Sequence, residues 1–205
     1  RTTAALLAEA PNDPERIYDH AQSEYWIGSV DYQRGRAKAA LPAFRAYKEL
    51  ADRLVSLAPD SPRFRKEAAY AEGNLCSVAM ERPRDAREAL RACSAALAEM
   101  EHAVEDLPAS RENDLALANR HALLANAYEI NGELGRARKE RLVEERLLNR
   151  RMSIDPKDME VSQSWIALQR ALAELDAREG QVGAGSRRLD RALFTIDRMT
   201  AFDPS

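Results

Sequence analysis

Apolar residues recur at intervals of three and four positions along most of the chain. The segments FRAYKELADRLVSLA (44–58) and LLANAYEI (123–130) show this spacing, and the segments between the turns lack the apolar–polar alternation of strands. Leu, Ala, Glu and Arg, which favour helices, are the dominant residues. The pattern predicts an all-α protein built from amphipathic helices.

Prolines divide this helical pattern at a nearly constant period. Pro11, Pro59, Pro108, Pro156 and Pro204 are separated by 48, 49, 48 and 48 residues. Two positions after each of the first four prolines is a residue whose side-chain oxygen can cap a helix N-terminus: Asp13, Ser61, Ser110 and Asp158. Each of these prolines is therefore predicted to lie where one helix has ended and the next begins.

A second turn is predicted halfway through each period. Gly35, Gly132 and Gly180 lie 24 residues after their prolines, and the second repeat has ERPRD (81–85) at that place. Five positions after the turn comes a small residue, which indicates close helix packing: Ala40, Ala89, Ala137 and Gly185. Each period therefore predicts two helices of about 20 residues, each about 30 Å long.

These boundaries predict a single repeat domain over residues 1–205. The repeats span residues 11–58, 59–107, 108–155 and 156–203, and residues 1–10 are interpreted as the tail of a preceding repeat's second helix. Because the first residue is Arg1, we expect the chain to be a segment of a longer protein.

The segment LLANAYEINGELGRA (123–137) resembles a tetratricopeptide repeat. The family pattern of a large apolar residue, a small residue, Tyr, a turn Gly and a second-helix Ala is met by Leu124, Ala125, Tyr128, Gly132 and Ala137. The first repeat matches with Ile27, Gly28, Gly35, Ala40 and Phe44. The common family period is 34 residues, so the period of 48 predicts a variant in which both helices are longer.

The resemblance implies a right-handed alpha-alpha superhelix, or solenoid, of about four antiparallel helical hairpins. It also implies a scaffold or sensor module that binds a protein or a peptide. Arrays of long period occur in large bacterial signalling and regulatory proteins, so the resemblance implies that setting for this chain.

In the family, the first helix of each hairpin lines the concave surface that binds the partner. On the first such helix, residues spaced by 4, 3, 4 and 3 positions form one stripe: Tyr18, Gln22, Tyr25, Ser29 and Tyr32. Tyrosines among polar residues suit an interface. The alternative is that these rings pack against a preceding repeat.

Three asparagines and one arginine complete the predicted partner-binding face. Asn126 follows Ala125, where the family often has an asparagine that holds a ligand's backbone, and Asn74 and Asn119 are predicted on equivalent faces. Arg170 is nearly the only basic residue at such a position, so the family's clamp for a terminal carboxylate is not expected. Solvated or locally bonded amides are the alternative interpretation for the asparagines.

Charge and hydropathy exclude several partners. The 31 basic and 34 acidic residues give a formal net charge of −3, which provides no overall attraction to nucleic acid or to an anionic membrane. The chain contains no run of 18 apolar residues, so no membrane span is predicted, and no signal peptide is visible. We therefore expect a protein or peptide partner, or a second copy in a homodimer, and a cytoplasmic location.

The residues that could carry chemistry are few. His20, His102 and His121 are scattered and lack the spacing of metal ligands, so no metal, cofactor or catalytic residue is predicted. Cys76 and Cys93 are predicted on facing helices as buried thiols, and a redox pair is the alternative. The basic residues between Arg136 and Arg151 are interpreted as a salt-bridged solvent face.

The sequence thus predicts a binding scaffold that is not an enzyme. Two alternatives belong to other classes. The array could mediate self-association through its ends or one face, or it could be a redox-responsive helical domain that uses Cys76 and Cys93.

Overall fold

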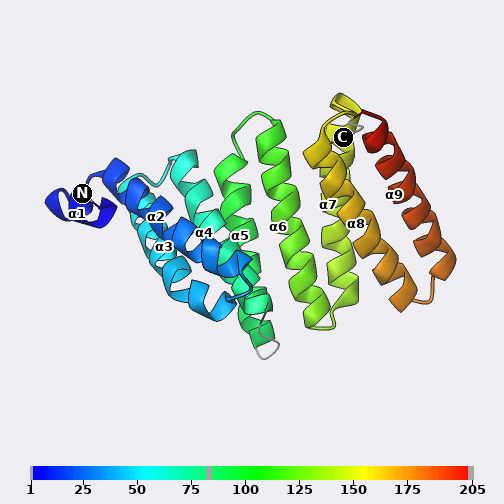
Figure 1. Cartoon of the computed structure of the whole chain (residues 1–205), viewed down its shortest axis with the longest axis horizontal. Coiled ribbons are helices and arrows are strands. Elements are labelled where there is room, and N and C mark those ends of the chain that lie inside the picture. The colour runs from blue at the N-terminus through cyan, green and yellow to red at the C-terminus, as the bar shows by residue number, and fades with distance from the viewer. Residues whose placement is uncertain (1, 82–84, 203–205) are drawn as a thin grey trace. The chain divides into compact units, whose positions relative to one another are not determined.

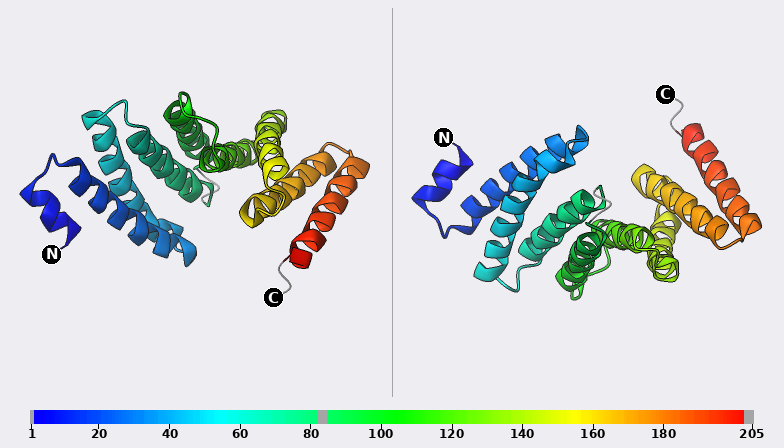
Figure 2. Two further views of the ribbon diagram at one scale, coloured as in Figure 1. Left: turned by 90° about the horizontal axis from the view of Figure 1, so that it is seen from above. Right: turned by 90° about the horizontal axis from the view of Figure 1, so that it is seen from below.

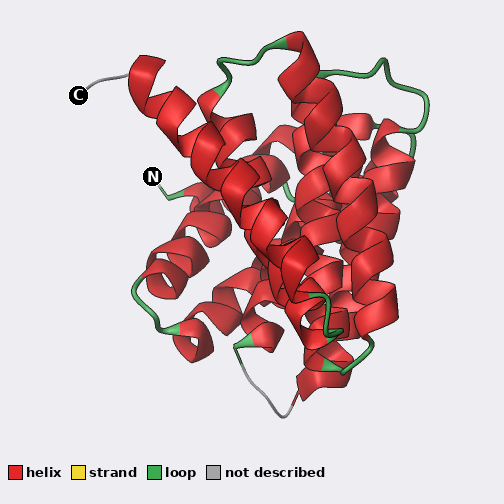
Figure 3. Cartoon of the chain, turned by 90° about the vertical axis from the view of Figure 1, so that its right-hand side faces the viewer, coloured by secondary structure: helices red, strands yellow, loops and turns green. Residues whose placement is uncertain are grey.

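The computed structural model describes residues 2–81 and 85–202, and all regular secondary structure within these ranges is helical (Figures 1 and 3). The predicted all-α class is confirmed. In the part of the chain described, no helix combines the length and the apolar character needed to cross a membrane. The chain divides into two compact units, residues 1–108 and 109–205.

The first unit contains a short helix and two hairpins. α1 (Thr3–Glu9) precedes α2 (Pro14–Gln33) and α3 (Ala37–Leu57), which form one hairpin, and α4 (Pro62–Met80) and α5 (Ala86–Val104) form the next. The helices of each hairpin pack on each other, and α3 also packs on α4 (Figure 2). The second turn, residues 82–84, lies outside the described residues.

The second unit repeats this arrangement. α6 (Arg111–Ile130) pairs with α7 (Leu134–Ile154), and α8 (Met159–Arg178) pairs with α9 (Val182–Phe202). α7 packs on α8, so the two hairpins are stacked. The four predicted antiparallel hairpins are therefore present, two in each unit.

The predicted N-caps begin the first helix of each hairpin. The Asp13 carboxylate accepts from the backbone N–H of Glu15, and the other capping oxygens each accept from the N–H three residues later: Ser61 from Phe64, Ser110 from Asn113 and Asp158 from Val161. Each bond satisfies one of the amides that a helix start leaves without an intrahelical partner. The recurring sequence pattern is thus a recurring start signal.

The turn within a hairpin requires a left-handed backbone in three of the four repeats. Gly35, Gly132 and Gly180 have φ values of 71°, 77° and 77°, a region that glycine adopts without steric cost. Past the turn, the matched small residues Ala40, Ala89 and Ala137 are completely buried. At the fourth such position, a Cβ added to Gly185 would lie 3.0 Å from the carbonyl oxygen of Ala173. Close packing at these positions is confirmed.

Apolar residues are buried where one hairpin meets the next. In the first unit, Phe44 of α3 is buried in a cluster with Val78 of α4. In the second unit, Leu148 of α7 is buried in a cluster with Val161 and Leu168 of α8. One hairpin cannot cover its own apolar face, so stacking supplies the core, as in repeat proteins generally.

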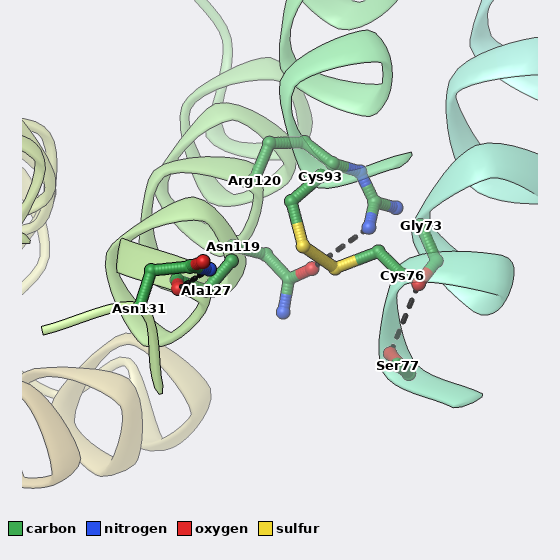
Figure 4. Close-up of a disulfide and its surroundings, with 8 residues drawn as sticks. All are labelled: Gly73, Cys76, Ser77, Cys93, Asn119, Arg120, Ala127 and Asn131. Atoms are coloured by element: carbon green, nitrogen blue, oxygen red, sulfur yellow. Dashed lines mark hydrogen bonds between the residues drawn. A yellow bond between two sulfur atoms is a disulfide. The ribbon is translucent and has the colours of Figure 1, made fainter. Parts of the chain in front are cut away.

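The prediction that Cys76 and Cys93 are buried thiols is wrong. The two side chains are fully buried, as expected, but their sulfurs form a disulfide that joins α4 to α5 across 17 residues of sequence (Figure 4). Facing positions on paired helices bring the two Cα atoms to 5.0 Å, within the range a disulfide spans. The cytoplasmic location remains a prediction, and the bond counts against it because disulfides persist mainly in oxidising compartments.

Candidate functional site

The predicted partner-binding residues all lie on the first helices of hairpins, as expected, and they form one group in each unit. The first group lies on α2 and α4, and the second lies on α6 and α8. In the first group, most side chains bond to or pack on other residues of the protein. In the second group, several donor groups line an open cavity.

The tyrosine stripe of α2 is largely occupied by contacts within the first unit. The Arg63 guanidinium lies 4.0 Å from the ring centroid of Tyr18, and the ring of Tyr25 lies 5.6 Å from that of Tyr47 on α3. The Tyr32 hydroxyl donates to Glu81, at 3.4 Å. These rings therefore contact α3 and the following hairpin, and their role in partner binding remains a prediction.

Gln22, also on the stripe, belongs to a buried polar cluster. Its amide nitrogen and the Tyr47 hydroxyl both donate to Glu67 Oε2, at 2.8 Å and 2.5 Å. Burial raises the pKa of Glu67, against the lowering effect of these two hydrogen bonds. The stripe residue Ser29 is also buried, and the Asn74 amide nitrogen is buried without a hydrogen-bond partner among the described residues. This group fills an interface between hairpins.

The second group lines an open cavity of about 290 Å³ in the second unit. Residues of α6 and α8 form its two sides, and residues of α7 complete it. Three of the nine predicted residues are in the lining, namely Asn119, Asn126 and Arg170. The other lining residues are Leu115, Ala118, Ala122, Arg141, Glu144, Leu148, Ser164, Ala167, Leu168 and Ala171.

Arg141 is the central polar residue of the cavity. It is 6% exposed, and one guanidinium nitrogen, Nη1, donates to Glu144 Oε2 at 3.0 Å. The other, Nη2, donates to Asn126 Oδ1 and, at 3.4 Å, to Glu129 Oε1. The Nε–H is buried and has no hydrogen-bond partner in the described structure. A buried donor without a partner is energetically costly.

Glu144 is the buried partner of this arginine. Burial raises the pKa of its carboxyl group to about 7, because desolvation disfavours the carboxylate more than the neighbouring Arg141 favours it. Within the described ranges, no cluster of His, Cys, Asp and Glu is arranged to hold a metal ion.

The two asparagines add amide donors to the α6 side of the cavity. Asn126 accepts from Arg141 through Oδ1, and Asn119 accepts from Arg120 through Oδ1, at 3.1 Å. Each amide is thereby oriented, and its Nδ2 group is left to donate. The side chain of Arg170 on α8 is 75% exposed and lies 4.0 Å from Glu174. The cavity thus combines apolar walls with several donors, a composition that suits carbonyl and carboxylate oxygens.

Sequence reasoning missed Arg141 and Glu144. The prediction that residues 136–151 form a solvent face is wrong for the inward side of α7: Arg141 and Glu144 are buried, and Arg150 and Arg151 both bind the buried Asp114 of α6. One signal was present, because Arg141 occupies the repeat position that holds the apolar Phe44 in the first repeat. A charged residue at a core position indicates a partner that the local sequence does not reveal.

No protein-family model matches the chain, and no curated protein is similar to it. Among solved structures, it is similar to a double mutant of MamA RS-1, with 14% identity, a TM-score of 0.35, and coverage of 88% of this chain and 96% of that one. It is also similar to MamA, residue 41 to the end, from Desulfovibrio magneticus RS-1, with 14% identity, a TM-score of 0.34, and coverage of 91% and 98%. The function of this chain is therefore inferred from its own geometry.

Proposed function

We propose that the chain is a non-enzymatic binding module, and that the cavity between α6 and α8 holds an extended segment of a partner protein. The module is a long-period array similar to tetratricopeptide repeats, with residues 1–205 forming one repeat domain. Its setting is a larger bacterial signalling or regulatory protein. The observation that carries the proposal is an open cavity in which two oriented asparagine amides and the exposed Arg170 lie beside apolar walls.

Peptide backbone supplies the acceptors that this cavity requires. An extended segment presents carbonyl oxygens along both of its edges, and the amides of Asn119 and Asn126 lie seven residues apart on one face of α6, about two helical turns. Both can donate to the same segment, while Leu115 and Leu168 contact its apolar side chains. Backbone recognition of this kind tolerates different sequences and fixes the direction and register of the segment.

Charge adds a preference for acidic segments. Arg170 is exposed in the cavity lining, and its ion pair within the described residues is with Glu174, which is itself exposed, at 4.0 Å. A carboxylate on the bound segment can therefore pair with Arg170 without displacing a buried partner. A charge-assisted hydrogen bond of this type is stronger than one between neutral groups. The expected ligand is an extended peptide with an acidic side chain beside an apolar one.

Selection from a random dodecapeptide library displayed on phage tests this proposal. Peptides selected on the wild-type chain are synthesised with a fluorescent label, and their Kd values are measured by anisotropy. Asn126→Ala and Arg170→Ala should each raise the Kd about tenfold, the effect of losing about 1.4 kcal/mol. The matched controls are Asn131→Ala, at the residue that follows α6, and Arg178→Ala, at the last residue of α8. Both lie outside the cavity lining and should leave the Kd unchanged.

Two results would contradict the proposal. The selected peptides could bind all four variants as tightly as the wild type, which would place their site elsewhere on the chain. Alternatively, the selection could yield no peptide that binds the wild type more tightly than a scrambled version of itself. Circular dichroism of each variant confirms that the helices are intact, so that a loss of binding reports on the cavity.

A further inference from the structure

The helices on the two sides of the cavity, α6 and α8, lie in register with each other. At their starts, the Arg111 guanidinium of α6 binds the Asp158 carboxylate at 2.5 Å and 2.9 Å. At their ends, Arg178 of α8 lies 3.8 Å from Glu129 of α6. The members of these pairs are 47 and 49 positions apart in the sequence. Residues of α6 and α8 that are one repeat period apart therefore lie at about the same level along the cavity.

This register gives the cavity an apolar end near the start of α6. Leu115 lines it from α6 and packs against the cluster that contains Ala118 and Leu148 of α7. Across the cavity at this level, α8 contributes only the small side chain of Ser164 to the lining. A bound segment can therefore place an apolar side chain against the α6 wall here.

The exposed cation of the cavity lies further along, on the opposite wall. Arg170 of α8 is one period after Ala122 of α6, which lies seven residues beyond Leu115, about 10 Å along the helix. On the cavity floor, the Glu144 carboxylate already accepts from Arg141, at 3.0 Å. A carboxylate on the bound segment therefore pairs with Arg170 at the α8 wall and keeps away from the floor.

The geometry of an extended chain fixes the spacing of the two side chains. Successive side chains point to opposite sides, and the chain advances about 3.3 Å per residue. Because Leu115 and Arg170 are on opposite walls, their two partners must be separated by an odd number of positions. One position spans about 3 Å and five span about 16 Å, whereas three span about 10 Å, which matches the distance between the two levels.

We propose that the cavity selects segments in which an apolar and an acidic side chain are three positions apart. The apolar side chain packs on Leu115 of α6, and the acidic one pairs with Arg170 of α8. This inference rests on the proposed function and adds to it the spacing by which a partner is recognised. The residues between the two contribute backbone, so their side chains can vary.

Deep sequencing of the dodecapeptides that the wild-type chain selects from the phage library measures the spacing. Pairs of an apolar and an acidic residue are counted at separations of one to five positions, in both chain directions, and compared with the unselected library. Pairs three positions apart should be enriched about tenfold, the ratio that one charge-assisted hydrogen bond can supply. Pairs two or four positions apart should not be enriched.

A charge-reversed variant tests the wall on which the acidic side chain lies. Arg170→Glu should keep the apolar preference and should select Lys or Arg, in place of Asp or Glu, three positions away. The matched control is Arg146→Glu, since Arg146 is an exposed arginine of α7 outside the cavity lining. It should select the same peptides as the wild type.

Three outcomes would overturn the inference, and they differ in what they leave standing. Selected peptides with the pair at an even separation, or with no preferred separation, would leave peptide binding intact and remove the spacing. An Arg170→Glu variant that still selects acidic residues would likewise leave peptide binding and remove the role of the α8 wall. A wild-type chain that enriches no peptide would overturn the proposed function and this inference together.

Discussion

Arg141 and Glu144 show how one pair of residues gives the second unit its polar cavity. An apolar residue at the position of Arg141 would extend the core, as Phe44 does in the first unit. The arginine instead binds Glu144, Asn126 and Glu129 and leaves one donor without a partner. Buried ion pairs contribute little net stability, because desolvation offsets the attraction between the charges. The arrangement therefore adds little to stability, which agrees with the binding role proposed for the cavity.

The raised pKa of Glu144 predicts a pH dependence of stability. Its pKa is about 7 in the folded protein, against an ordinary value of 4.5, so the folded state holds this proton more tightly than the unfolded state. The stability that this group contributes is therefore present below about pH 4.5 and is lost as the pH rises through 7. The loss is on the order of 3 kcal/mol, at 1.36 kcal/mol per pKa unit.

Glu144→Gln should remove this dependence, because the amide does not titrate. Urea unfolding followed by circular dichroism at pH 5 and pH 8 measures it. The wild type should lose about 2 kcal/mol more than the variant between the two pH values. Equal losses in both proteins would show that the buried carboxyl group ionises at its ordinary pKa.

At the scale of the element, the N-caps are the local feature that sets where the first helix of each hairpin begins. Asp158 has two roles: it caps α8 through Val161 N–H, and it binds Arg111 of α6 at 2.5 Å and 2.9 Å. The hydrogen bond from Arg111 lowers the pKa of Asp158, although burial opposes this. The arginine is half exposed, and exposed ion pairs add little to stability. The cap is therefore expected to be the larger contribution.

Two substitutions separate the cap from the ion pair. Asp158→Asn keeps an oxygen that can accept from the backbone and removes the charge, so it should reduce stability only slightly. Asp158→Ala removes both and should cost about 1 kcal/mol. Thermal unfolding by circular dichroism measures both variants. If Asp158→Asn destabilised the chain as much as Asp158→Ala, the charge pair and not the cap would hold the start of α8.

At the scale of the whole molecule, the chain consists of two units that differ in the bonds that join their helices. The first unit contains the disulfide between α4 and α5. The second contains the arginine pairs with buried carboxylates, including Arg150 and Arg151 with Asp114. Closing a loop of 17 residues restricts the unfolded chain and stabilises by about 3 kcal/mol in the entropic description. This stabilisation belongs to the first unit.

Reduction should therefore act on one unit only. With a phosphine reductant, hydrogen exchange followed by mass spectrometry should become faster in peptides from α4 and α5 and remain unchanged in peptides from α6 to α9. The double variant Cys76→Ala, Cys93→Ala should show the faster exchange without reductant and should not respond to it. Faster exchange throughout the chain on reduction would mean that the two units unfold together.

The sequence by itself determined the elements of this protein. Caps such as Ser110 and turn glycines such as Gly132 act on backbone within a few residues, so their spacing predicted where each helix begins and where each hairpin turns. The repeat also placed Asn119, Asn126 and Arg170 on first helices, because helical spacing and a resemblance to a known pattern are local information.

The tertiary structure alone decided the chemistry. Whether Arg141 is solvated or buried and whether Cys76 bonds Cys93 depend on how one helix packs on the next. Burial, bonding partners and pKa values depend on which groups packing removes from water. The linear pattern of residues does not specify which groups these are. The helices could be predicted from their residues, whereas the cavity and the disulfide required the packed chain.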